Sequence, residues 1–338
     1  MLDLMTASDH EQARSTASRA RDIRWLIGVI LCFVPMIALA VSPWHEATVF
    51  AFVGLMPTLL VVPLGWRTAA VATVSVTGVV LVGSLLASLP WAAVVFMIAV
   101  CLGVVIAQSR GWGASATYIA TQGAMTVVID PATRLAGTVP VGVEALAAAG
   151  VVFVGSLWVM LVGLILLRDV PLPKPPTPTP KELRRYGILL FLVVAPITFV
   201  AVTWFSGTDV WWVLLTVFVI LQPDPAKTRT RLLERVLGTV VGGAVAAVLA
   251  VLIHAQPAVT AIGSLLAIAS AVAYLKAPYW VYASTLTAAV VFLSFTPATA
   301  LIGDAERIGF TLIAAVAVAA VSLLSEQVAR PRADRSQP

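Results

Sequence analysis

The stretch Gln222–Thr239, QPDPAKTRTRLLERVLGT, places four basic residues between two apolar runs. Residues 210–221, VWWVLLTVFVIL, precede it, and residues 240–253, VVGGAVAAVLAVLI, follow it. A helix needs roughly 20 apolar residues to cross the hydrocarbon core of a bilayer, and each run with its neighbours approaches this length. The pattern therefore predicts two membrane helices joined by a charged loop.

Composition places the whole chain in the same class. Of its 338 residues, 60% are hydrophobic and 11% are charged, and the mean hydropathy is +1.00. A soluble domain carries about a quarter charged residues. We therefore expect an all-α polytopic membrane protein with about twelve transmembrane helices. The expected spans lie near residues 24–41, 46–63, 68–88, 91–108, 112–129, 143–167, 185–205, 209–222, 232–253, 258–275, 279–296 and 307–327.

The basic residues predict the orientation of these helices. Lysine and arginine near the ends of spans mark the cytoplasmic side of a membrane protein. With both termini in the cytoplasm, all but two of the 21 lysine and arginine residues fall on that side. The exceptions are Arg134 and Arg307, which we expect at the outer ends of helices with solvated acids such as Glu144 and Asp304. No ionisable side chain is expected near the middle of a helix.

A proline-rich linker divides the chain into two predicted units. The segment over residues 170–185, VPLPKPPTPTPKELRR, contains six prolines, and proline cannot continue a helix. The expected order is a cytoplasmic tail over 1–23, a first six-helix repeat over 24–168, the linker over 169–184, a second six-helix repeat over 185–327 and a cytoplasmic tail over 328–338.

Two matching segments indicate that the units are related. YIATQGAMTVVIDPAT begins at Tyr118 and YASTLTAAVVFLSFTPAT begins at Tyr282, and both precede the last helix of their unit. Because each unit has an even number of helices, the repeat would be parallel, about an axis along the membrane normal. Tyr118, Thr121, Tyr282 and Thr285 are then candidates to line a polar route between the units. The alternative is that these hydroxyls only bond the backbone or a neighbouring helix.

The basic stretch also has a helical pattern. If a helix starts near Thr228, then Arg231, Arg235, Gly238 and Gly242 lie on one face, at steps of 4, 3 and 4. Guanidinium groups at a helix N-terminus favour an anion, and Lys227 and Arg229 would add long-range attraction. The alternative is that these basic residues only follow the positive-inside rule and meet lipid phosphate.

The segment WWVLLTVFVILQPDPAKTRTRLLERVLGTVVGG resembles the signature of the fusaric acid resistance protein-like (FUSC) family, which includes the aromatic acid exporters and is distantly similar to the plant malate channels. The matching positions are Trp212, Thr216, Gln222, Pro223, Arg231, Arg235, Gly238 and Thr239. The resemblance implies transport of organic anions, generally outward, across the bacterial inner membrane. It also implies a pathway between two six-helix units.

Two features depart from that family pattern. The equivalent loop of the first unit, PLGWRTAA, offers only Arg67 in place of the basic run. The large cytoplasmic domain that usually separates the halves of the exporters is replaced by the proline-rich linker. A symmetric pore lining and the export partners of the family therefore do not carry over directly.

The sequence favours transport over catalysis. No phosphate-binding loop, nucleophile motif, metal-ligand spacing or dinucleotide fingerprint is present, so we expect no enzyme, no cofactor and no metal. The expected partners are a small organic anion and membrane lipid, without nucleic acid. A homodimer is an alternative to a monomer, although both halves are present in one chain. The rival function is a non-transporting envelope protein whose basic loop binds anionic lipid or a partner.

Tryptophans near predicted helix ends, among them Trp66, Trp112 and Trp211, fit an aromatic belt at the membrane interface. They are not expected to form a substrate site.

Overall fold

The computed structural model describes residues 23–43, 48–129, 140–167, 177–253, 256–294 and 299–329. All regular structure within these ranges is helical, which confirms the predicted all-α class. The tail over residues 1–22, the first half of the linker (residues 169–176) and residues 330–338 lie outside the described residues.

Each predicted span contains a helix in the described ranges. The first part holds a helix over Ile23–Cys32, then α2 (Val34–Ala40), α3 (Thr48–Val61), the 3-10 helix η2 (Val62–Leu64), α4 (Trp66–Leu86), α5 (Pro90–Ser109), α6 (Gly113–Val128) and α7 (Val141–Leu166). The second part holds α8 (Pro180–Trp204), α9 (Trp211–Ile220), α10 (Pro225–Ile253), α11 (Gln256–Lys276), α12 (Tyr279–Ser294) and α13 (Ala300–Ala329).

Six of the described helices are long and apolar enough to cross a membrane, namely α4, α5, α7, α8, α10 and α13. The helix over Ile23–Cys32 and α2 together form a seventh candidate, bent by 42°. The chain is therefore a multi-pass membrane protein. Some of the other helices are short: α9 has 10 residues and a length of about 15 Å, half the thickness of the hydrocarbon core.

The helices pack in corresponding pairs in the two parts. In the first part α4 contacts α6 and α7, α5 contacts α6, and α3 contacts α7. In the second part α10 contacts α12 and α13, α11 contacts α12, and α9 contacts α13. Across the two parts, α5 contacts α8, α6 contacts α9 and α3 contacts α12. One apolar core continues through both parts.

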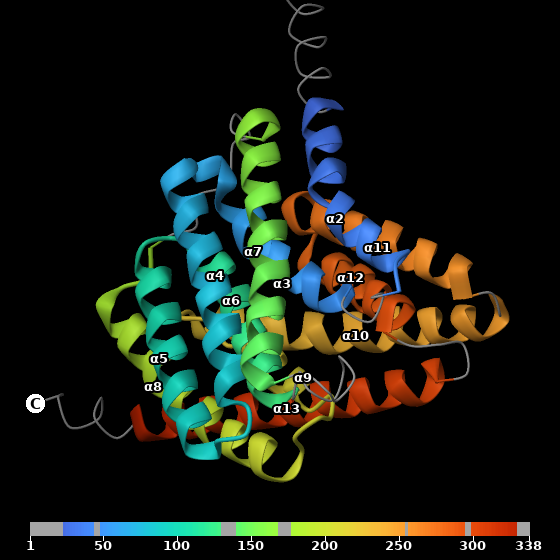
Figure 1. Ribbon diagram of the computed structural model, residues 1–338. Coiled ribbons are helices and arrows are strands. Elements are labelled where there is room, and N and C mark those ends of the chain that lie inside the picture. Colours follow the sequence, from blue (N-terminus) through green and yellow to red (C-terminus); the bar gives the residue numbers. More distant parts are fainter. Residues whose placement is uncertain are drawn as a thin grey trace, which may run out of the picture.

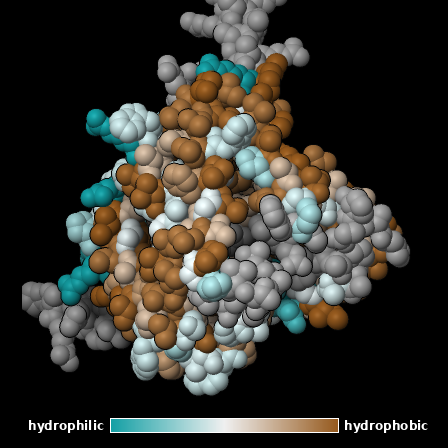
Figure 2. All heavy atoms as spheres, viewed as in Figure 1, coloured by the Kyte–Doolittle hydropathy of each residue, from teal (hydrophilic) through white to brown (hydrophobic). Residues whose placement is uncertain are grey.

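The long helices do not share one direction in the view of Figure 1. There α4 and α7 run nearly upright, whereas α10 and α13 run across the picture. Spans in a flat bilayer tilt by only about 0–40° from its normal, so twelve crossings about one axis stay a prediction. The face that carries α4, α5 and α7 is mostly apolar, as Figure 2 shows in brown.

The start of α8 corrects the predicted linker. Thr179 accepts a hydrogen bond from the backbone N–H of Glu182, whose carboxylate accepts one from the backbone N–H of Thr179. This capping box and Pro180 in the first turn favour helix initiation. The helix therefore begins inside the segment over residues 169–184 that we expected to be the linker.

Candidate functional site: a buried arginine pair

The turn between α9 and α10 positions the basic stretch. Asp224 accepts a hydrogen bond from the backbone N–H of Ala226 at 2.9 Å, so the carboxylate of Asp224 caps α10. The hydroxyl of Thr228 accepts one from the backbone N–H of Gln222 at 3.0 Å and ties the turn to the helix. The helix begins at Pro225, so the predicted start near Thr228 is wrong by one turn.

The four basic residues of this stretch have graded exposure. Lys227 and Arg229 are exposed, as a solvated loop predicts. Arg231 is half-buried, and its guanidinium carbon lies 3.9 Å from the centre of the Tyr279 ring. Arg235 is only 1% exposed. One further turn of α10 takes the Arg235 side chain into the helix packing, so this cation is buried rather than exposed at the helix N-terminus.

Arg235 lies among other helices and lacks hydrogen-bond partners for part of its guanidinium. Its side chain is beside the hydroxyl of Tyr279 on α12, and its charge interacts with that of Arg307 on α13. The Nε and Nη1 atoms are buried and donate no hydrogen bond. Among the described residues Arg235 has no ion pair.

Arg307 is the second buried cation, and its side chain is 1% exposed. Its Nη1 donates to the backbone oxygen of Thr287 at 2.8 Å, and its Nη2 lies 3.3 Å from the Thr287 hydroxyl. The guanidinium carbon lies 4.2 Å from the centre of the Trp212 ring on α9. Its Nε has no partner. Three helices, α9, α12 and α13, thus surround this cation.

Arg307 is not among the predicted site residues, because the apolar pattern predicts the last helix to begin at residue 307. The structure starts α13 at Ala300, so Arg307 lies two turns inside the helix. The signal was present in the apolar residues over 300–303, which precede the charged group Asp304 to Arg307.

Asp304 lies one turn before Arg307 and is only 4% exposed. Its charge interacts with that of Arg307, and its Oδ1 has no hydrogen-bond partner. Its carboxylate lies so close to Gly243 of α10 that any side chain at this glycine would collide with it. Asp209, before α9, also interacts electrostatically with Arg307.

The expectation of solvated acids at the outer helix ends is therefore wrong for Asp304. It is also wrong for Glu144 in the first turn of α7, which is 2% exposed and whose two carboxylate oxygens have no partner. Buried ionisable groups in a membrane protein are costly and commonly functional.

The predicted glycine face brings α10 against α12. A Cβ at Gly238 would lie 2.6 Å from the Cβ of Ala283, and one at Gly242 would collide with the backbone of Ser284. Arg235, Gly238 and Gly242 share one buried face, as their spacing predicts. The close approach fixes the position of Arg235 relative to α12 and Tyr279.

The two predicted tyrosines, Tyr118 and Tyr282, are connected by a third tyrosine that lies between them. Tyr118 of α6 and Tyr282 of α12 both contact Tyr274 of α11, at ring-centre distances of 6.5 and 5.0 Å. By contrast, Thr121 and Thr285 each donate to a backbone oxygen one turn earlier in their own helix, at 2.9 Å. The hydroxyls of Thr121 and Thr285 are thus bonded within their own helices, which favours the alternative that they do not line a polar route.

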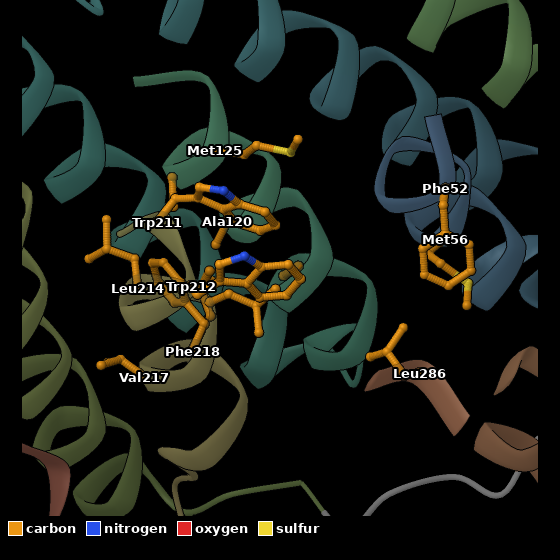
Figure 3. Packing of buried hydrophobic residues seen from close by; sticks show 14 of the residues in the cluster. Phe52, Met56, Ala120, Met125, Trp211, Trp212, Leu214, Val217, Phe218 and Leu286 are labelled. Atoms are coloured by element: carbon orange, nitrogen blue, oxygen red, sulfur yellow. The ribbon is translucent and has the colours of Figure 1, made fainter. Parts of the chain in front are cut away.

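The interior beside the arginine pair is aromatic. Trp211 and Trp212 stack at a ring-centre distance of 4.0 Å, and Figure 3 shows both next to Ala120 of α6. Trp211 lies at the start of α9, as predicted, but its side chain is buried inside the protein. Phe52 of α3 and Leu286 of α12 lie across the same interior in Figure 3.

Comparisons with known proteins address the part of the chain that carries this site. Residues 197–321 match the model of a family described as fusaric acid resistance protein-like. The match includes Trp212, Arg235, Thr287, Asp304 and Arg307. Searches of curated proteins and of solved structures each found no match. The segment over residues 197–321 is thus similar to the fusaric acid resistance protein-like family, which confirms the resemblance that the stretch around Arg235 predicts.

Proposed function

We propose that this protein exports small organic anions, such as aromatic carboxylic acids, across the bacterial inner membrane, and that Arg235 and Arg307 bind the anion. The observation that carries this proposal is the burial of two neighbouring guanidinium groups, each with an N–H that lacks a hydrogen-bond partner. Within the described ranges neither group forms an ion pair, although the charges of Asp304 and Asp209 act on Arg307.

The cost of burying these charges favours a ligand. An arginine at the centre of a membrane helix costs at least about 2.5–3.5 kcal/mol. The bonds of Arg307 to Thr287 and its contact with Trp212 offset part of this cost. The Nε and Nη1 atoms of Arg235 receive no such compensation. A carboxylate suits both groups because a planar guanidinium can donate two parallel hydrogen bonds to it.

The exposed basic residues provide a route to this pair. Lys227 and Arg229 are exposed at the start of α10, and Arg231 lies over Tyr279 one turn before Arg235. An anion attracted by the exposed charges would pass Arg231 and reach Arg235 and then Arg307. The positive charge of these side chains would thus select anions along the entry path.

The positions of the short helices support a pathway between the two halves. α9 and α12, like α3 and α6, have 16 residues or fewer, and they are the second and fifth helices of their halves. Short helices at corresponding positions of two repeats commonly form the transport site. The recurring contacts, such as α4 with α7 and α10 with α13, favour a duplication. Separation of the halves would open the packed interior around Trp212 and Phe52.

Transport can be measured with purified protein in liposomes. We expect efflux of radiolabelled benzoate above that of protein-free vesicles, and no transport of a cation of similar size. Arg235→Gln and Arg307→Gln should each raise the KM for the anion by tenfold or more, since truncating a desolvated charge partner costs about 2–5 kcal/mol. The effect should persist at high salt.

Two exposed residues provide matched controls. Lys227→Gln and Arg229→Gln remove a charge from the same helix, and their effect should disappear at about 0.5 M salt, where screening confines charge interactions to a few ångströms. Absence of anion flux from correctly inserted wild-type protein would contradict the proposal and favour a non-transporting envelope protein. Unchanged KM in Arg235→Gln and Arg307→Gln would reject the arginine pair as the binding site.

A further inference from the structure

A cavity of about 580 Å³ lies in the first half of the chain, far in sequence from the arginine pair. Its walls are α4 and α5, and residues of α6 contribute to its floor. The residues that line it are mostly apolar, including Val71, Val74, Val82, Phe96 and Ile106. Its volume is within the range of about 300–1,000 Å³ that is typical of sites for small organic molecules.

The cavity is an elongated groove. Its lining extends from Thr68 to Val82 on α4, and from Phe96 on α5 to Arg110 directly after the end of α5. The α4 wall is about 21 Å long at 1.5 Å per residue. This exceeds half of the roughly 30 Å hydrocarbon thickness, the depth of one lipid leaflet. Two wall residues, Gly78 and Gly103, face open space, because a Cβ at either would meet no atom within 4 Å.

The groove opens toward hydrocarbon along its length. Both walls belong to candidate membrane spans, and Val74 on α4 is 67% exposed. Two of the lining hydroxyls are already bonded to backbone oxygens: Ser115 donates to Pro57 at 2.8 Å and Thr68 to Gly65 at 2.7 Å. The groove thus suits a flexible apolar chain rather than a polar ligand.

One end of the groove carries positive charge. Arg110 lines this end, and its guanidinium carbon lies 6.0 Å from the centre of the Trp112 ring. At the same end Arg67, in the first turn of α4, lies 5.5 Å from the ring centre of Trp66. Both arginines are exposed, and neither has an ion pair among the described residues.

Arg67 and Arg110 have no acidic residue near them in the sequence, since residues 48–129 contain no aspartate or glutamate. Arginine beside tryptophan is typical of the membrane interface, where lipid phosphate lies. The charged end therefore complements an anionic head group, and the apolar length complements its chain.

We propose that this groove binds one acyl chain of an anionic phospholipid, with the phosphate at Arg110 and Arg67. The chain lies along Gly78 and Gly103, and the head group remains at the interface beside Trp112. The basic residues predict this end to be cytoplasmic, which assigns the lipid to the inner leaflet. This site is independent of the proposed anion transport.

Native mass spectrometry of the detergent-purified protein tests the site with two lipids that share the same chains. Dioleoyl phosphatidylglycerol should remain bound at lower concentration than dioleoyl phosphatidylcholine. Gly78→Leu with Gly103→Leu should weaken binding of both lipids by about tenfold, a change of about 1.4 kcal/mol. Arg110→Gln should weaken phosphatidylglycerol alone by about fivefold, the factor that about 1 kcal/mol for one basic residue gives.

Gly150→Leu is the matched control, because Gly150 on α7 is exposed, also meets no atom within 4 Å and does not line the groove. Its lipid binding should equal that of wild type. Glycerol 3-phosphate, a head group without chains, should not compete. Equal retention of the two lipids in wild type, or unchanged binding in the Gly78 and Gly103 double variant, would overturn the proposal. The proposal would also be overturned if the wild-type protein were a dimer and the Gly78 and Gly103 double variant a monomer. That result would show that a second copy of the chain, rather than a lipid, fills the groove.

Discussion

At the scale of single residues, the acidic neighbour of Arg307 controls the net charge of the buried cluster. Asp304 interacts with Arg307 and has an oxygen without a hydrogen-bond partner. Its carboxylate offsets one of the two buried positive charges and repels an arriving anion. If the cluster is the proposed anion site, it would bind an anion less tightly than two arginines alone would.

Asp304→Asn should therefore strengthen anion binding. We expect the KM for benzenesulfonate, an anion that stays ionised at every relevant pH, to fall roughly three- to tenfold, or about 0.7–1.4 kcal/mol. Liposome flux measures this. Glu306→Gln removes an exposed charge from the same helix and should leave the KM unchanged. A higher KM in Asp304→Asn would indicate that this carboxylate instead holds Arg307 in position.

The sequence could predict Arg235 but not Arg307. Arg235 is four residues after Arg231 and precedes Gly238 and Gly242 at helical spacing, so its helix face can be read directly. Arg307 enters the site through contacts with Trp212 and Thr287, which come from helices distant in sequence. Hydropathy alone also places a charged residue at a helix end, whereas the structure buries this one two turns inside α13.

At the scale of helices, the contact between α10 and α12 positions the candidate site. The backbone of Ser284 lies against Gly242 without room for a side chain. Small residues permit such close approach in membranes, where packing rather than the hydrophobic effect holds helices together. The pair is therefore sensitive to any added volume.

Gly242→Leu should destabilise the protein by about 1–3 kcal/mol, the usual cost of overpacking. A thermal shift assay in detergent should report a lower Tm. Gly309→Leu provides the comparison, because a Cβ at Gly309 of α13 meets no atom within 4 Å, and its Tm should stay close to that of wild type. Equal Tm values for wild type and Gly242→Leu would show that the two helices separate without cost.

The positions of helices were predictable, but their lengths were not. Apolar runs located α9 and the end of α10 to within a few residues, since hydropathy reports where the chain avoids water. The start of α10 lies seven residues before the predicted span over 232–253. The capping of α10 by Asp224 and the termination of α9 at Ile220 depend on local hydrogen bonds. For this reason α9 has only 10 residues, fewer than the predicted span over residues 209–222.

At the scale of the whole molecule, the all-helical membrane class was predictable, whereas the arrangement of the helices was not. Hydropathy does not specify which helices pair, so contacts between the parts, such as α5 with α8 and α6 with α9, had no signal in the sequence. The twelve crossings and the cytoplasmic termini remain predictions that labelling can test.

Single cysteines at Arg134 and Ser336 would measure the topology. The native Cys32 and Cys101 are both buried and can be replaced by alanine first. We expect an impermeant maleimide to label Arg134→Cys in intact cells, and Ser336→Cys only after the membrane is permeabilised. Labelling of Ser336→Cys in intact cells, with Arg134→Cys protected, would invert the predicted orientation.

The uneven distribution of charge between the halves has a consequence for selectivity. The single charged residue within the helices α3, α4, α5 and α6 is Arg67. By contrast, α10 carries the buried Arg235 and α13 carries the buried Arg307. In the proposed pathway, a molecule that passes between the halves would therefore contact a positively charged surface on one side and an apolar surface on the other. An aromatic ring with a single carboxylate would suit both surfaces, because its carboxylate can contact the arginines while its ring contacts the apolar side. A small dicarboxylate, polar at each end, would leave its second charge facing Phe52 or Met125, so the passage would discriminate by amphipathicity rather than by size.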